Sequence, residues 1–114
     1  MRNTREHDVK NSIMVSTCDI VDWLNNPVGV ARIGDRTIRY GAGGVGASDL
    51  LGIMRGSGIF VACEVKVPGK KPTEEQKTFL RRVASAGGIA FCAHSSEEAK
   101  FFLTARPISC ISGT

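Results

Sequence analysis

A short turn between two apolar segments constrains the fold of this chain more than any other feature. The turn is Arg55-Gly56-Ser57-Gly58, and a two-residue loop at Gly56-Ser57 predicts an antiparallel hairpin. Opposed residue numbers in a hairpin have a constant sum, so Asp49 is expected opposite Glu64. A shift of one residue would move Asp49 to the other face of the sheet, so this prediction depends on the loop length.

The predicted pairing brings two acids together beside a lysine. Directly opposed side chains share a sheet face with Cβ atoms roughly 5 Å apart, where two like charges repel unless a cation lies between them. Lys66 follows Glu64 by two residues and projects from the same face. The carboxylates are hard oxygen ligands of the kind that Mg²⁺ prefers. This arrangement is typical of a metal-dependent nuclease.

The remaining sequence predicts one α/β domain over residues 1–114, with a mixed sheet. Apolar periodicity predicts a helix over residues 4–24, two short strands at 28–33 and 37–40, and the hairpin that follows. Capping patterns at Thr73-Glu74-Glu75-Gln76 and Ser95-Ser96-Glu97-Glu98 predict two later helices, with a strand at 89–93 between them. The order is helix, three or four antiparallel strands, helix, strand, helix. The strand-helix-strand step over residues 59–93 should be a parallel crossover.

Composition argues against several classes of protein. No apolar run approaches the ~20 residues that a membrane span needs, and the polar start differs from a signal peptide, so a cytoplasmic protein without membrane contact is expected. The four cysteines, Cys18, Cys63, Cys92 and Cys110, are scattered, which favours reduced core thiols over a zinc site or disulfides. His7 and His94 lack recognisable partners and are interpreted as surface or satisfied histidines.

The formal charge of +4 is unevenly distributed. Basic residues follow the acid pair at Lys66, Lys70, Lys71, Lys77, Arg81 and Arg82, and precede it at Arg32, Arg36 and Arg39. A cationic rim around an acidic centre suits a phosphate backbone drawn to a bound metal. A solvated helix face would explain Lys77, Arg81 and Arg82 equally well.

The segment Gly41-Ala42-Gly43-Gly44-Val45-Gly46 matches the spacing of a dinucleotide-binding loop. Such a loop must open a helix that holds the pyrophosphate, yet the following sequence is interrupted by Gly52, Gly56 and Gly58. A steric role is the better interpretation, because glycines let backbone approach nucleic acid or a partner subunit closely. A nucleotide cofactor remains an alternative.

Four segments in order resemble the virus-type replication-repair nuclease domain, VRR-NUC, over residues 5–103. They are Gly44-Val45-Gly46-Ala47-Ser48-Asp49-Leu50-Leu51-Gly52, Phe60-Val61-Ala62-Cys63-Glu64-Val65-Lys66, Glu75-Gln76-Lys77-Thr78-Phe79-Leu80 and Gly87-Gly88-Ile89-Ala90. The resemblance implies the PD-(D/E)xK superfamily and its restriction-endonuclease-like core, a mixed sheet flanked by helices in the order α-β-β-β-α-β-α. Ala47-Ser48 stands where the family has proline or valine before the aspartate.

Carried over residue by residue, the resemblance implies catalytic roles for Asp49, Glu64, Lys66 and Gln76. Asp49, Glu64 and the Val65 carbonyl would be metal ligands, joined by the first-helix acid, for which Glu6 and Asp8 compete. Lys66 would position or activate the attacking water. Gln76 matches the helix motif beside the site, although its place at the third helical position also suits a capping role.

The implied function is Mg²⁺- or Mn²⁺-dependent hydrolysis of DNA, with Lys70, Lys71, Lys77 and Arg81 as DNA contacts. Small stand-alone members of the family are typically phage or bacterial homodimers that resolve Holliday junctions, so branched DNA, a role in DNA repair and a homodimer are expected. Gly41–Gly46 or the apolar tail 108–111 could form the subunit contact. A DNA-binding module with this fold and no catalysis is the alternative from another functional class.

Overall fold

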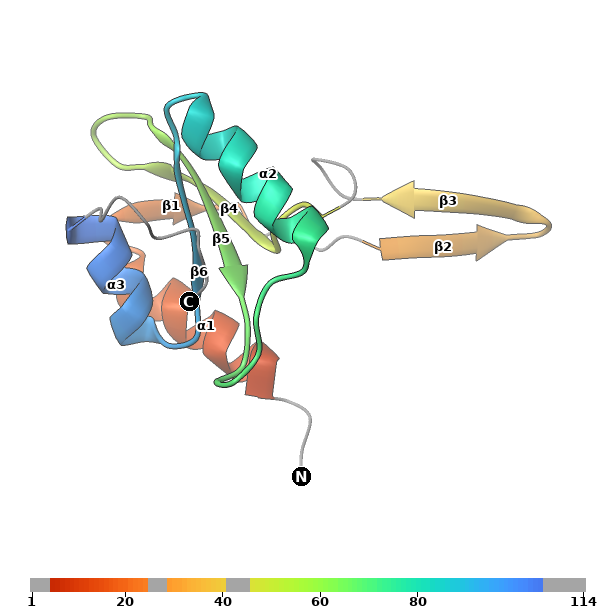
Figure 1. Ribbon diagram of the computed structural model, residues 1–114, viewed down its shortest axis with the longest axis horizontal. Helices are drawn as coiled ribbons and strands as arrows, with labels where there is room; N and C mark the ends of the chain where they lie inside the picture. The colour runs from red at the N-terminus through yellow and green to blue at the C-terminus, as the bar shows by residue number, and fades with distance from the viewer. Residues whose placement is uncertain (1–4, 25–28, 41–45, 106–114) are drawn as a thin grey trace.

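The computed structural model describes residues 5–24, 29–40 and 46–105 and is an α/β arrangement with three layers (Figure 1). The helices are α1 (Arg5–Thr17), α2 (Glu74–Ser85) and α3 (Ser96–Ala105). The strands are β1 (Val21–Trp23), β2 (Gly29–Ile33), β3 (Arg36–Tyr40), β4 (Leu50–Met54), β5 (Phe60–Val65) and β6 (Ile89–Ala93). The predicted fold class is confirmed, with the additional strand β1 and a different role for β2 and β3.

The central sheet has the strand order β1-β4-β5-β6. β4 is antiparallel to both β1 and β5, whereas β5 and β6 run parallel through the crossover helix α2, as predicted. Strands β2 and β3 form a separate two-stranded sheet that projects away from the body of the molecule (Figure 1). The sequence pattern did not distinguish this hairpin from strands of the main sheet, because both show the same local strand signals.

The predicted first helix is too long. α1 ends at Thr17, whose hydroxyl donates to the Ile13 carbonyl at 2.6 Å and accepts from the Trp23 indole N–H at 2.8 Å. The chain then turns, and Val21–Trp23 pairs with β4. β-branched and aromatic side chains fit a pleated edge better than a continuing helix, which explains why tertiary pairing ends α1 here.

The β4–β5 hairpin has the predicted register through a different turn. Leu50 lies opposite Cys63 and Ile53 opposite Phe60. The two-residue loop at Gly56-Ser57 was wrong, because the Met54 N–H donates to the Ile59 carbonyl at 2.8 Å and the loop therefore covers residues 55–58. Register is unchanged since both loops are centred on the same point.

Two apolar layers bury the sheet. On one face α1 and α3 enclose a core that includes Ile13, Leu50, Val61, Phe91 and Leu103. On the other face α2 packs Phe79, Leu80 and Val83 onto Leu51 and Ala62. Because α2 covers Ala62, the central sheet is buried on both sides.

Candidate active site

Asp49 lies directly before β4, and Glu64 lies near the end of β5. Strand pairing ends at Leu50 opposite Cys63, so the same register continued by one residue sets Asp49 against Glu64. Asp49 is half-buried in a bend, whereas Glu64 is buried with a relative exposure of 2%. Two neighbouring antiparallel strands thus bring the two acids to one end of the hairpin.

Glu64 is held in an environment that disfavours its charge. Burial raises the pKa of its carboxyl to about 8, and the negative charges of Asp49 and Glu6 act in the same direction against the lowering effect of Lys66. One carboxylate oxygen, Oε1, is buried and has no hydrogen-bond partner among the residues that the structure describes. A buried acid with an unsatisfied oxygen beside a second acid is the environment that a bound cation would relieve.

Lys66 is the cation nearest to this acid in the structure's ion pairs. Its Nζ lies 3.9 Å from Glu64 Oε2, and its side chain is largely buried. Both residues face the same side of β5 because they are two positions apart. The lysine therefore stands where it can reach a phosphate held at the acids.

Glu6 contributes from the first turn of α1, where it is exposed and raises the pKa of Glu64. Asp8 is exposed in the same turn. In the described parts of the chain, no group of three His, Cys, Asp or Glu side chains is close enough to enclose a metal ion. The donor set that fits a cation is therefore the Asp49 and Glu64 pair, and ligand roles for Glu6 and the Val65 carbonyl stay predictions.

Gln76 forms the predicted capping box at the start of α2. Its side-chain oxygen accepts from the Thr73 backbone N–H at 2.8 Å, and its own N–H donates to the Thr73 hydroxyl at 3.1 Å. The Gln76 oxygen is therefore committed to the helix terminus. A catalytic role for Gln76 stays a prediction that rests on the remaining amide group.

The first turn of α2 is connected to the segment that leads into the site. Gly46 has φ of +82°, and a Cβ atom at this position would overlap the backbone carbonyl of Glu75. At Gly46 the glycine is thus required by contact with α2, and residues 41–45 lie outside the described residues. The chain after Gly46 leads to β4 and opens no helix, which removes the structural basis for a dinucleotide-binding loop.

The loop between β5 and α2 carries Lys70 and Lys71, both exposed. His94 donates through Nδ1 to a Glu98 carboxylate oxygen at 2.8 Å and through Nε2 to the Lys70 carbonyl at 2.7 Å. The interpretation of both histidines as surface or satisfied residues is confirmed, since His7 is exposed and its ring lies 3.2 Å from the Asn11 amide. The spacing of four residues between His94 and Glu98 was the sequence signal that could have predicted this hydrogen bond.

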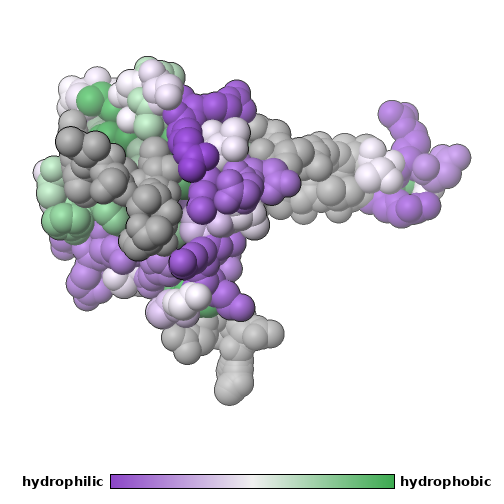
Figure 2. All heavy atoms as spheres, in the orientation of Figure 1, coloured by the Kyte–Doolittle hydropathy of each residue, from purple (hydrophilic) through white to green (hydrophobic). Residues whose placement is uncertain are grey.

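The other basic residues are distributed differently from the sequence expectation. Lys77 pairs with Glu74 at 3.4 Å, and Arg81 and Arg82 are exposed along α2. Arg32 and Arg36 flank the turn of the β2–β3 hairpin, far along the projecting ribbon, so they do not rim the acid pair (Figure 1). Figure 2 shows this hydrophilic tip separated from the polar side chains of α2.

The cysteines do not form a second site. Cys63 and Cys92 are buried thiols, and burial raises the pKa of both, that of Cys92 to about 12. Cys18 is exposed, so its assignment to the core was wrong, and Cys110 lies outside the described residues. No helix in the described ranges has the length and apolar character of a membrane span.

A buried acid beside a second acid, with a lysine two residues on, is the arrangement expected at the active site of a PD-(D/E)xK-like fold. A family model for the VRR-NUC domain matches residues 4–97, and the chain therefore belongs to the VRR-NUC family of nucleases. A nuclease domain implies DNA as the substrate. Searches of curated proteins and of solved structures gave no match.

Proposed function

We propose that this protein is a Mg²⁺- or Mn²⁺-dependent DNA endonuclease in which Asp49 and Glu64 hold the cation. The single observation that supports this most strongly is the buried Glu64 oxygen, which has no hydrogen-bond partner among the described residues, on an acid whose pKa is raised to about 8. A buried carboxylate with an unsatisfied oxygen lowers the stability of the fold, and a purely structural role would give nothing in return. A divalent cation would polarise the scissile phosphate and lower the pKa of a bound water.

In this proposal the side chains have distinct tasks. Asp49 and Glu64 provide hard oxygen ligands from two strands that are fixed by the hairpin. Lys66, 3.9 Å from Glu64, offsets negative charge that develops on the phosphate and positions the attacking water. Gln76 supports the site from the first turn of α2, and Glu6 adds negative charge from α1.

The substrate is proposed to be branched DNA. Lys70, Lys71, Lys77 and Arg81 lie on the loop before α2 and on α2 itself, and they would contact phosphates on the side of the sheet that α2 covers. One domain would supply one active site, whereas a four-way junction needs two symmetric incisions. A C2 homodimer supplies both, and a DNA-repair role in bacteria or phage-infected cells follows from such a substrate.

The direct test is cleavage of a panel of labelled DNAs, comprising linear duplex, flap and four-way junction, with Mg²⁺, with Mn²⁺ and with chelator. We expect metal-dependent cleavage with the junction cut preferentially and in paired positions. Asp49→Asn, Glu64→Gln and Lys66→Ala should each reduce the rate by at least roughly 100-fold while the protein stays folded. Wild-type rates in all three purified variants would show that the active site is elsewhere.

Matched controls exist on α3. Glu97 and Lys100 are exposed residues of the same charge types, and Glu97→Gln and Lys100→Ala should leave cleavage unchanged. Binding of DNA by the wild type without cleavage under any metal would instead identify a DNA-binding module that keeps the fold. Light scattering of the same samples tests the dimer.

A further inference from the structure

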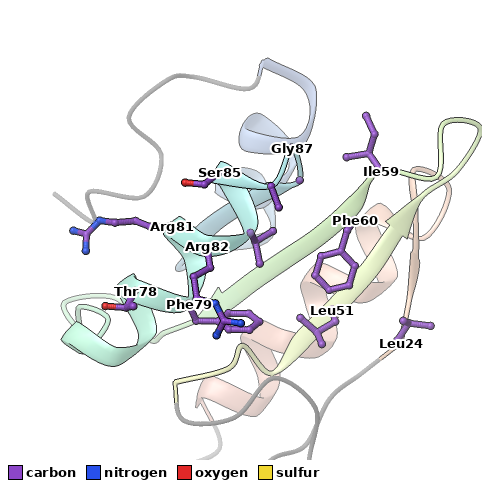
Figure 3. Close-up of a pocket in the computed structure, with 13 residues that line it drawn as sticks. Leu24, Leu51, Ile59, Phe60, Thr78, Phe79, Arg81, Arg82, Ser85 and Gly87 are labelled. Carbon is purple, nitrogen blue, oxygen red and sulfur yellow. The ribbon is translucent and has the colours of Figure 1, made fainter.

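A wide groove lies between α2 and the β4–β5 hairpin and encloses about 1300 Å³. Its apolar wall is formed by Leu24, Leu51, Ile59, Phe60, Phe79 and Val83, and Figure 3 shows Leu51 and Phe60 pointing into the space in front of α2. Pockets for small molecules usually enclose roughly 300–1,000 Å³, so this groove suits an extended ligand better than a compact one.

Apolar side chains in the groove are unusually exposed for a domain of this size. Phe60 is 41% exposed and Leu24 is 55% exposed, although both are large apolar residues. Figure 2 shows apolar surface at the end of the molecule that carries the β4–β5 hairpin, next to the hydrophilic side chains of α2. An exposed apolar patch with a polar border is typical of a binding surface.

The charges of the groove indicate the class of ligand. The charged residues that line it are Arg81 and Arg82, and none of the described lining residues is acidic. The Arg82 guanidinium lies 6.0 Å from the centre of the Phe79 ring, at the edge of the groove. Aromatic rings beside arginine are the elements with which proteins hold single-stranded nucleic acid, because bases stack on rings and phosphates pair with guanidinium groups.

The groove also lies close to the acids. Leu51 is the β4 residue that lines the groove, and Asp49 stands two residues before it in the chain. Asp49 lies directly before β4, so the Cα atoms of Asp49 and Leu51 are at most roughly 7 Å apart. A nucleotide in the groove would therefore be within a few nucleotides of a phosphate at Asp49.

From this juxtaposition we infer that the groove binds unpaired nucleotides of the DNA next to the cleaved bond, with a base stacked on Phe60 and a phosphate at Arg82. This inference rests on the proposed nuclease function and names the part of the substrate that the groove selects. It explains why a nuclease that acts at branch points would expose an aromatic ring, since flaps and forks carry unpaired bases that intact duplex lacks.

The test measures DNA binding in the absence of divalent metal, so cleavage plays no part in it. The probes are a fluorescein-labelled oligothymidine of about 12 nucleotides, within the length range that such grooves cover, and a fully paired duplex. Phe60→Ala and Phe60→Leu should each weaken oligothymidine binding roughly tenfold, which corresponds to the loss of one stacked base. Duplex affinity should be unchanged, and Phe60→Tyr should bind oligothymidine as the wild type does.

Phe101→Ala is the matched control, because Phe101 is a similarly exposed phenylalanine on α3 with a relative exposure of 53%. It should leave both affinities unchanged. Arg82→Ala should weaken oligothymidine binding and reduce its salt dependence. Phe60→Leu keeps an apolar side chain at the site, so it decides the question if Phe60→Ala fails to fold.

Three outcomes would overturn the inference. Oligothymidine affinity could be unchanged in Phe60→Leu, or it could fall equally for duplex, which would indicate a general effect on the DNA surface. Alternatively, Phe60→Leu could lower the mass in light scattering without changing DNA affinity, which would identify a second copy of the chain as the occupant. A failed cleavage assay with Phe60-dependent oligothymidine binding would reject the nuclease proposal alone.

Discussion

Lys66 Nζ lies 3.9 Å from Glu64 Oε2, while the other oxygen of the same carboxylate is buried and without a hydrogen-bond partner in the described structure. The lysine therefore compensates only part of the carboxylate, and burial still raises the pKa of Glu64 to about 8. The pair is incomplete as a structural ion pair, and in the proposed function the buried oxygen would coordinate the cation.

Metal binding should release a proton. With a pKa of about 8, Glu64 is mostly protonated at neutral pH, and a divalent ion must displace that proton to bind the carboxylate. The affinity for Mn²⁺ should therefore rise by up to about tenfold per pH unit between about pH 6 and 8. Isothermal titration calorimetry in two buffers of different ionisation enthalpy measures the proton directly. Glu64→Gln should abolish its release, and equal affinity across this range would contradict the prediction.

Glu64→Gln should also stabilise the metal-free protein at high pH. The folded-state pKa of Glu64 lies above that of the unfolded chain, so the unfolding free energy falls as the pH rises toward and through about 8. The neutral amide removes this loss, and we expect a gain of about 2 kcal/mol near pH 9, with less difference near pH 4. Urea unfolding at both pH values checks this. A destabilised variant at high pH would show that the carboxylate is stabilising as an anion.

His94 should also make stability depend on pH. Partial burial lowers the pKa of His94, but hydrogen bonds to Glu98 and the Lys70 carbonyl outweigh it and raise the pKa overall. The stability that His94 contributes is thus fully present below its ordinary pKa and is lost as the pH rises through the raised value. His94→Asn should lower Tm at about pH 5.5 more than at about pH 8.5. Equal losses of Tm for His94→Asn at both pH values would refute the prediction.

Gly46→Ala should destabilise the fold far more than Gly34→Ala. Both glycines have positive φ, but an added Cβ at Gly46 would overlap the Glu75 carbonyl, whereas at Gly34 it would meet nothing within 4 Å. We expect a loss of roughly 3 kcal/mol at Gly46 and about 1 kcal/mol at Gly34. Chemical denaturation measures both. Similar losses at the two positions would show that the contact with α2 relaxes easily.

DNA affinity should fall steeply with salt. Lys70 and Lys71 are exposed on the loop before α2 and are proposed as phosphate contacts. Replacing both with alanine should reduce the slope of log affinity against log salt by about 2. Fluorescence anisotropy at several salt concentrations measures the slope, and Lys10→Ala together with Lys100→Ala is the matched control. An unchanged slope would place the DNA elsewhere on the surface.

Local sequence patterns predicted the features that depend on residues close together in the chain, such as helix caps and hairpin register. The capping box at Thr73 and Gln76 was readable because it depends on residues three apart. The opposition of Asp49 and Glu64 was predicted from register alone, and it survived a wrong loop because 55–58 and 56–57 share a centre. The length of the loop depends on the conformations of Gly56 and Gly58, which both have positive φ. Glycine allows this conformation but does not require it, so the sequence alone could not predict the loop length.

Long-range contacts were the part that could not be predicted. Trp23 belongs to a strand because β4 accepts it at the sheet edge, although its neighbours continue an apolar helical stripe. The exposed groove beside Phe60 depends on where α2 crosses the sheet, and no local pattern encodes that position. The same holds for Arg32 and Arg36, which adjoin the site in sequence and lie apart from it in space.

The separate β2–β3 hairpin offers a place to attach probes. Its strands pair with each other and lie outside the four-stranded sheet, so a change at its turn breaks no hydrogen bond of the core ladders. The turn residues Gly34 and Asp35 are exposed. A fluorophore, affinity tag or inserted reporter domain at this turn would leave the catalytic body unaltered, which makes the protein suitable for single-molecule observation on DNA.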